Sequence, residues 1–80
     1  MSGRPVKHSV TLKGHRTSIS LEDAFWMELR RISAETNKPI NALVADIDVK
    51  RGTRLGLASA IRVFVLEDLK AQLERAQMDA

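Results

Sequence analysis

Basic side chains gathered near the start of the chain are the residues whose types and spacing most clearly suggest a chemistry. Residues 1–20 contain four of the 13 lysines and arginines and no acid, whereas residues 21–80 contain nine basic and ten acidic residues. Clustered Lys and Arg favour a polyanion, because binding phosphate groups releases condensed counterions. The sequence therefore predicts a polyanion partner at one end of the molecule, and a solvated N-terminal tail remains the alternative. The four basic residues are Arg4, Lys7, Lys13 and Arg16.

Side-chain combinations typical of enzymes and metal sites are not found in the sequence. No nucleophile stands near a base and an orienting residue, and no glycine loop has the pattern that holds phosphate in enzymes. The chain has no cysteine, and its two histidines lack the spaced carboxylates of a zinc site. We therefore expect no catalytic residues, no metal and no cofactor.

Length and composition predict one small folded domain. A chain of 80 residues buries a modest core, and without disulfides dimerisation is the remaining way to stabilise it. The content of 44% hydrophobic and 29% charged residues is typical of a folded chain. The longest apolar run, Val63 to Leu66, is too short for a transmembrane helix, and the N-terminus lacks the apolar core of a signal peptide. We expect a cytoplasmic protein with no membrane partner.

Residues 9–21 alternate between apolar and polar side chains, which predicts β structure. The alternation changes phase once, because Val10 and Leu12 have even numbers whereas Thr17, Ile19 and Leu21 have odd ones. A turn at Gly14 and His15 would explain the change. The pairs in that hairpin would be Leu12 with Thr17 and Val10 with Ile19. A loose basic arm followed by a single strand from residue 16 stays open as the alternative.

Helix signals follow this segment. Ser20 and Asp23 form a Ser-x-x-Asp signature for a first helix, which should end at Asn37 because Asn tolerates the left-handed conformation. Pro39 suits the first position of a second helix, and Gly52 should end it. The expected organisation is a single domain, 1–80, with a basic arm at 1–8, a ribbon strand region at 9–21 and helices at 22–37, 39–51 and 57–77.

A third, longer helix is predicted because apolar residues recur every four residues from Leu57 to Leu73. Its stretch 61–66 would pass for a buried strand in isolation, but strong helix formers flank it on both sides. Two short helices of the same chain could not cover so wide an apolar set, so we expect a second subunit to do so. The expected dimer core contains Ile19, Leu21, Phe25, Leu29, Leu43, Val44, Ile47, Ile61, Phe64 and Val65.

The stretches 14–26 (GHRTSISLEDAFW) and 57–66 (LASAIRVFVL) resemble the start and end of a small ribbon-helix-helix domain family common in alphaproteobacteria. The likeness covers roughly residues 6–67. It implies a mainly α fold with a short N-terminal β-ribbon, that is, a ribbon-helix-helix homodimer with an additional C-terminal helix. It also implies a bacterial DNA-binding transcriptional regulator that inserts an intersubunit antiparallel β-ribbon into the major groove of double-stranded DNA, as the methionine and Arc repressors do.

The resemblance also assigns DNA contacts to particular residues. Outward side chains of the ribbon strand would contact base edges, and these are Arg16, Ser18 and Ser20. Backbone N–H groups at the start of the second helix would bind a phosphate. The residues expected at phosphate groups are Lys7, Lys13, Lys38, Ile40 and Asn41.

Some features depart from this family pattern. Two serines are shorter than the side chains typical of repressor ribbons, and Ser20 could instead cap the first helix. Asp46 and Asp48 would repel phosphate, although Arg62 could pair with one of them or with Glu67. The alternative function is therefore a dimeric, antitoxin-like interaction module whose helices hold a protein partner.

Overall fold

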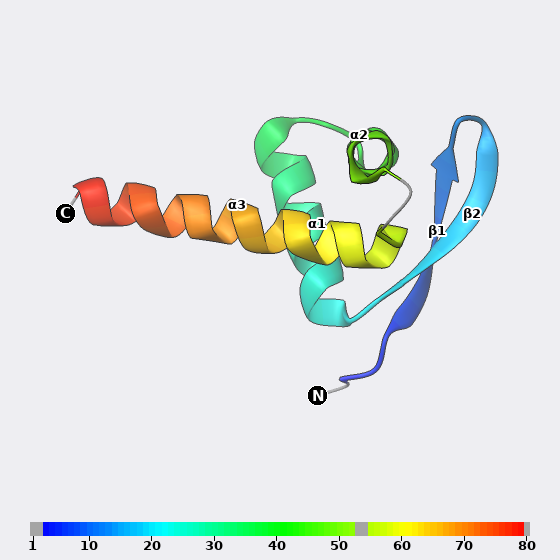
Figure 1. Cartoon of the computed structure of the whole chain (residues 1–80), viewed down its shortest axis with the longest axis horizontal. Coiled ribbons are helices and arrows are strands. Elements are labelled where there is room, and N and C mark those ends of the chain that lie inside the picture. The colour runs from blue at the N-terminus through cyan, green and yellow to red at the C-terminus, as the bar shows by residue number, and fades with distance from the viewer. Residues whose placement is uncertain (1–2, 53–54, 80) are drawn as a thin grey trace.

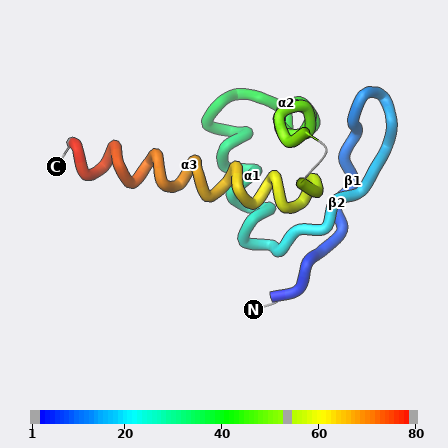
Figure 2. The backbone as a smooth tube through the Cα atoms, viewed as in Figure 1, coloured from blue at the N-terminus to red at the C-terminus, as the bar shows by residue number. Residues whose placement is uncertain are grey.

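The structure, a computed structural model, describes residues 3–52 and 55–79. An antiparallel hairpin lies beside three helices, and the C-terminal part of the last helix extends past the others (Figures 1 and 2). The fold is thus mainly α, with an N-terminal β-ribbon and an additional C-terminal helix, as predicted. The elements are β1 (Val6–Leu12), β2 (His15–Leu21), α1 (Asp23–Thr36), α2 (Ile40–Arg51) and α3 (Leu57–Asp79).

A two-residue turn joins the strands one residue earlier than the sequence suggested. Lys13 and Gly14 both have positive φ, 52° and 79°, and Leu12 pairs with His15. Positive φ at both central residues is typical of a type I′ hairpin turn, in which glycine favours the second position. The predicted pairing is therefore wrong, because each residue of β1 pairs with a residue of β2 two positions earlier than expected. The observed pairs include Val10 with Thr17 and His8 with Ile19.

The hairpin, rather than a loose arm, is the observed alternative, and β1 already begins at Val6. Three residues of the expected basic arm are thus part of the strand. The inner side chains of both strands are buried, with exposed fractions of 3% for Val10, 5% for Ile19 and 0% for Leu21. The hairpin is accordingly part of the hydrophobic core.

We expect Gly14→Ala to destabilise the hairpin turn. A Cβ at this position would meet no atom within 4 Å, so the penalty comes from the positive φ alone. A non-glycine residue in this region costs about 1–2 kcal/mol, which urea unfolding would detect as a lower midpoint. Gly3→Ala is the control, because Gly3 also has open space around it and no positive φ. An unchanged midpoint for Gly14→Ala would contradict the turn described above.

Both ends of α1 have a local cause. Glu22 is the N-cap and makes no side-chain capping bond, so the predicted capping role of Ser20, a residue of β2, is wrong. The strand β2 stays extended as far as Leu21 and includes Ser20. The N-cap position therefore falls on Glu22, directly before Asp23, where α1 begins. At the other end Asn37 has φ 57° and donates its N–H to the carbonyl oxygen of Ala34. The predicted helix end at Asn37 is confirmed.

The other two helices also follow their sequence signals. Pro39 is the N-cap of α2 rather than its first helical residue, and Gly52, with φ 70°, follows its last turn. The strand-like stretch 61–66 is helical, because the helix-forming flanks on both sides continue through it. None of the helices in the described ranges has an apolar stretch long enough to cross a bilayer.

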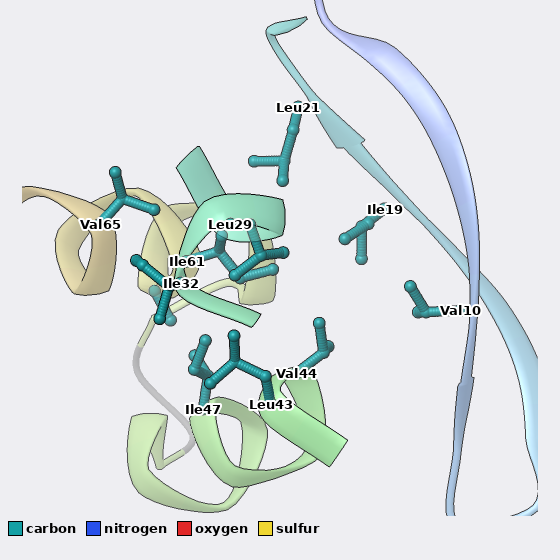
Figure 3. Close-up of a cluster of buried hydrophobic side chains, with 11 residues drawn as sticks. Val10, Ile19, Leu21, Leu29, Ile32, Leu43, Val44, Ile47, Ile61 and Val65 are labelled. Atoms are coloured by element: carbon teal, nitrogen blue, oxygen red, sulfur yellow. The ribbon is translucent and has the colours of Figure 1, made fainter. Parts of the chain in front are cut away.

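The core draws on both strands and all three helices (Figure 3). Of the ten residues expected in a dimer core, eight are buried within the single chain, and Phe25 and Phe64 are partly buried against them. The helix α3, for which we expected a second subunit as cover, packs mainly against α2 and α1 of the same chain and less against β2. The buried cluster contains Val10, Ile19, Leu21, Leu29, Ile32, Leu43, Val44, Ile47, Ala60, Ile61 and Val65.

Arg31 connects α1 to α3 at the surface. Its guanidinium donates to Asp68 at 2.8 Å, to Glu35 at 2.8 Å and to Glu28 at 2.7 Å. These hydrogen bonds, that of Asp68 foremost, raise the pKa of Arg31 above its usual value. Asp68 belongs to α3, so the pair holds the two helices where they cross.

Candidate nucleic-acid interface

Six polar side chains share the side of the hairpin that faces away from the helices. Successive side chains of a strand alternate between its two faces, and Val10, Ile19 and Leu21 occupy the buried face. The six residues on the other face are all exposed. We call them the outer face, and they form the pairs Lys7–Ser20, Ser9–Ser18 and Thr11–Arg16.

The outer face has the chemistry of a DNA-reading surface. It carries two cations, four hydroxyl groups and no acid. Lys7 is on β1 and Arg16 on β2, so each strand brings one positive charge, and Lys13 adds a third at the turn. An Arg side chain can bind guanine O6 and N7 together, and hydroxyls donate to or accept from several bases.

The sequence pattern identified the outer residues of β2 but, on β1, only Lys7, which was expected at a phosphate. The structure places Arg16, Ser18 and Ser20 together on β2, exposed and facing away from the core. Ser9 and Thr11 of β1 lie opposite them and were not singled out. The alternation along residues 9–12 could have identified them, because inward-facing Val10 and Leu12 leave Ser9 and Thr11 facing outward. This reasoning requires that these residues form a strand, which the sequence left open.

The N-terminus of α2 lies beside β1. The Asn41 side-chain oxygen accepts the Thr11 backbone N–H at 3.0 Å, although the two residues are 30 positions apart. Pro39 provides no side-chain cap, so the N–H groups of Ile40 and Asn41 are at an uncapped, positive end of the helix dipole. The structure thus brings the two expected phosphate-binding N–H groups to the edge of the ribbon.

The acids of α2 are paired. Lys38 forms an ion pair with Asp46, and the Nε of Arg51 donates to Asp48 at 2.7 Å. The pair with Asp46 offsets part of the Lys38 charge, so this lysine attracts phosphate less than a lone cation would. By the same pairing, the acids of α2 repel phosphate less than their number suggests.

Glu22 and Arg62 fasten the junction between β2 and α1. The Arg62 Nε donates to the Glu22 carboxylate at 2.9 Å, and its guanidinium lies 5.8 Å from the centre of the Phe25 ring. Arg62 therefore pairs with Glu22, and not with the acids of α2 or with Glu67 as the sequence suggested. A backbone hydrogen bond, followed by the bond from Arg62, lowers the pKa of Glu22. The first acid after the ribbon is thus held against α3.

Among residues 3–52 and 55–79, the acidic side chains and the histidines are the groups that metal ions bind in proteins. In these ranges no three His, Asp or Glu side chains are grouped so that they could hold a metal ion. The paired carboxylates described above contact cations of the chain itself.

Comparison with known proteins agrees with this architecture. Searches of curated proteins and of solved structures found no match. A family model described as a ribbon-helix-helix domain matches residues 5–69. The match runs from the residue before β1 to the middle of α3 and so includes the hairpin, α1 and α2. Since it covers most of the sequence, the chain belongs to the ribbon-helix-helix domain family.

Proposed function

We propose that this protein is a cytoplasmic DNA-binding regulator of transcription that places its β-ribbon in the major groove. Ribbon-helix-helix domains are typically DNA-binding transcriptional regulators, and they generally dimerise. We accordingly propose that two chains act together on DNA. The observation that carries the proposal is the outer face, an exposed two-stranded surface with cations on both strands, hydroxyls between them and no acid.

Each part of the interface has a distinct role in this proposal. Arg16, Ser18 and Ser20 contact base edges, which gives sequence preference. Lys7, Lys13 and the N–H groups at the start of α2 contact phosphates on the flanks, which fixes the position of the ribbon. Asn41 helps to place those N–H groups, since it ties α2 to β1.

A salt titration of duplex binding tests the proposal. Two phosphate-contacting cations per chain, Lys7 and Lys13, should give a slope of log K against log salt of about −2 per bound chain. Lys13→Ala should reduce that slope by about 1, and Lys70→Ala, an exposed lysine on α3, should leave it unchanged. A slope near zero for the wild-type protein would refute DNA binding through this surface.

A protein-interaction module is the second candidate, and one observation favours it. Leu66, Leu69 and Leu73 of α3 are 56%, 40% and 59% exposed, at spacings of three and four residues. They belong to the middle part of α3, whose C-terminal end extends past the other helices (Figure 2). A stable protein complex that forms without DNA and is lost in Leu69→Asp would favour this candidate.

A further inference from the structure

The ladder of the hairpin leaves each strand with one outer edge. Leu12 and His15 flank a two-residue turn and so form a hydrogen-bonded pair, after which such pairs alternate along the ladder. The backbone N–H and C=O groups of the residues between these pairs therefore point away from the partner strand. The outer edge of β1 contains Lys7, Ser9 and Thr11, and that of β2 contains Arg16, Ser18 and Ser20.

The outer edge of β1 is blocked at both ends. At one end the side-chain oxygen of Asn41 accepts the N–H of Thr11 at 3.0 Å, so this donor is not free for another strand. At the other end Pro5, directly before β1, has no N–H. Unpaired backbone groups make an edge strand a template for further strands, and proteins prevent this with proline, with charged residues or with a covering element. Lys7 adds a charge between the two blocked ends.

The outer edge of β2 has no such block. Within residues 3–52 and 55–79, nothing accepts a hydrogen bond from the outward N–H groups of this edge. The strand contains no proline. A hollow of about 460 Å³ lies beside β2 and is bounded on its other sides by residues of α2 and α3, among them Arg51 and Leu57. This edge therefore has free backbone groups and adjoining space for an added strand.

The strand that fits this edge is β2 of a second copy. In an antiparallel pair centred on Ser18, Arg16 of one copy would lie opposite Ser20 of the other. Each outward N–H would then meet an outward C=O, and no like charges would face each other. Such a pair has two-fold symmetry, the usual symmetry of a homodimer, and ribbon-helix-helix domains generally dimerise.

We infer that Asn41 and Pro5 close the outer edge of β1, so that a further strand joins the ribbon only at β2. One open edge per chain limits strand pairing to two chains, whereas two open edges would let further chains add. The side chain of Asn41 thus controls assembly, apart from the phosphate contact proposed for its backbone N–H. The inference rests on the proposal that two chains act together, and its test needs no DNA.

Proline at either of two matched serines shows which edge is used. Ser9 and Ser18 lie opposite each other, and the N–H of each points outward, so proline at either position removes an outward donor and no ladder bond. In analytical ultracentrifugation we expect the wild type and Ser9→Pro to have the mass of two chains, and Ser18→Pro that of one. A wild type of one chain, two chains for Ser18→Pro, or one chain for Ser9→Pro would overturn the inference.

The contact of Asn41 is tested by removing it and then removing the donor that it binds. Asn41→Ala frees the Thr11 N–H and should give a mean mass above two chains that rises with protein concentration. Adding Thr11→Pro removes the freed donor and should restore two chains, a rescue that a general loss of stability would not show. Asn41→Asp keeps an oxygen acceptor and should stay at two chains.

The outcomes for these variants separate the inference from the proposed function. If Asn41→Ala stays at two chains at every concentration, or if Thr11→Pro does not reverse its association, Asn41 does not close the edge and the inference fails. All masses are measured without DNA. A protein that assembles as expected but binds no duplex therefore refutes the proposed function alone.

Discussion

Replacing Arg16 by alanine is expected to weaken specific DNA binding by about 5- to 150-fold. The reason is that one bidentate contact between arginine and guanine contributes about 1–3 kcal/mol. Arg16 is exposed on the outer face, opposite Thr11, and has room for such a contact. The measurement is fluorescence anisotropy at fixed salt, with a duplex enriched from a random library by the wild-type protein.

Two further variants define what the Arg16 result means. Arg30→Ala removes the same charge from an exposed position on α1, away from the ribbon, and should leave the affinity unchanged. Arg16→Lys should keep the salt slope but lose the preference for the enriched duplex, because lysine lacks the planar fork of arginine. Equal losses for Arg16→Ala and Arg30→Ala would contradict the proposed reading surface.

Leu29→Ala should lower the free energy of unfolding by about 2–5 kcal/mol, because it removes buried methyl groups and leaves a cavity. Leu29 is 0% exposed on α1 and belongs to the core cluster that also includes Leu21 and Ile61. For a domain of this size, such a loss is a large part of the total stability. Urea unfolding, followed by circular dichroism, measures it.

Met27→Ala is the control for the core prediction. Met27 lies on the same helix but is 67% exposed, so its loss should change stability by no more than about 0.5 kcal/mol. A Leu29→Ala variant as stable as Met27→Ala would show that the core described here is not the one that folds the chain.

Local signals account for the parts of the fold that could be predicted. The helices follow from apolar periodicity, and the end of α1 follows from the tolerance of Asn37 for positive φ. The hairpin register did not follow, because Gly14 fits either of two adjacent turns and only the conformation of Lys13 distinguishes them. The difference of one residue in the turn was enough to change every cross-strand pair.

Contacts distant in sequence limited the prediction of the candidate site. Parity along β2 was enough to place Arg16, Ser18 and Ser20 on one face, since alternation is a local property. The partner of Arg62 lies 40 residues away, and that of Thr11 lies 30 residues away. Neither spacing follows from a pattern within one element, and both contacts depend on how the hairpin and the helices pack.

The stacked rings of His8 and Trp26 give the chain an optical reporter of its own. Trp26 is the only tryptophan, and the imidazole that contacts it comes from β1. Indole emission responds to a ring in direct contact, so detachment of β1 would change the fluorescence without any added dye. Whether that strand moves when a duplex is added can therefore be followed in real time on the unmodified protein.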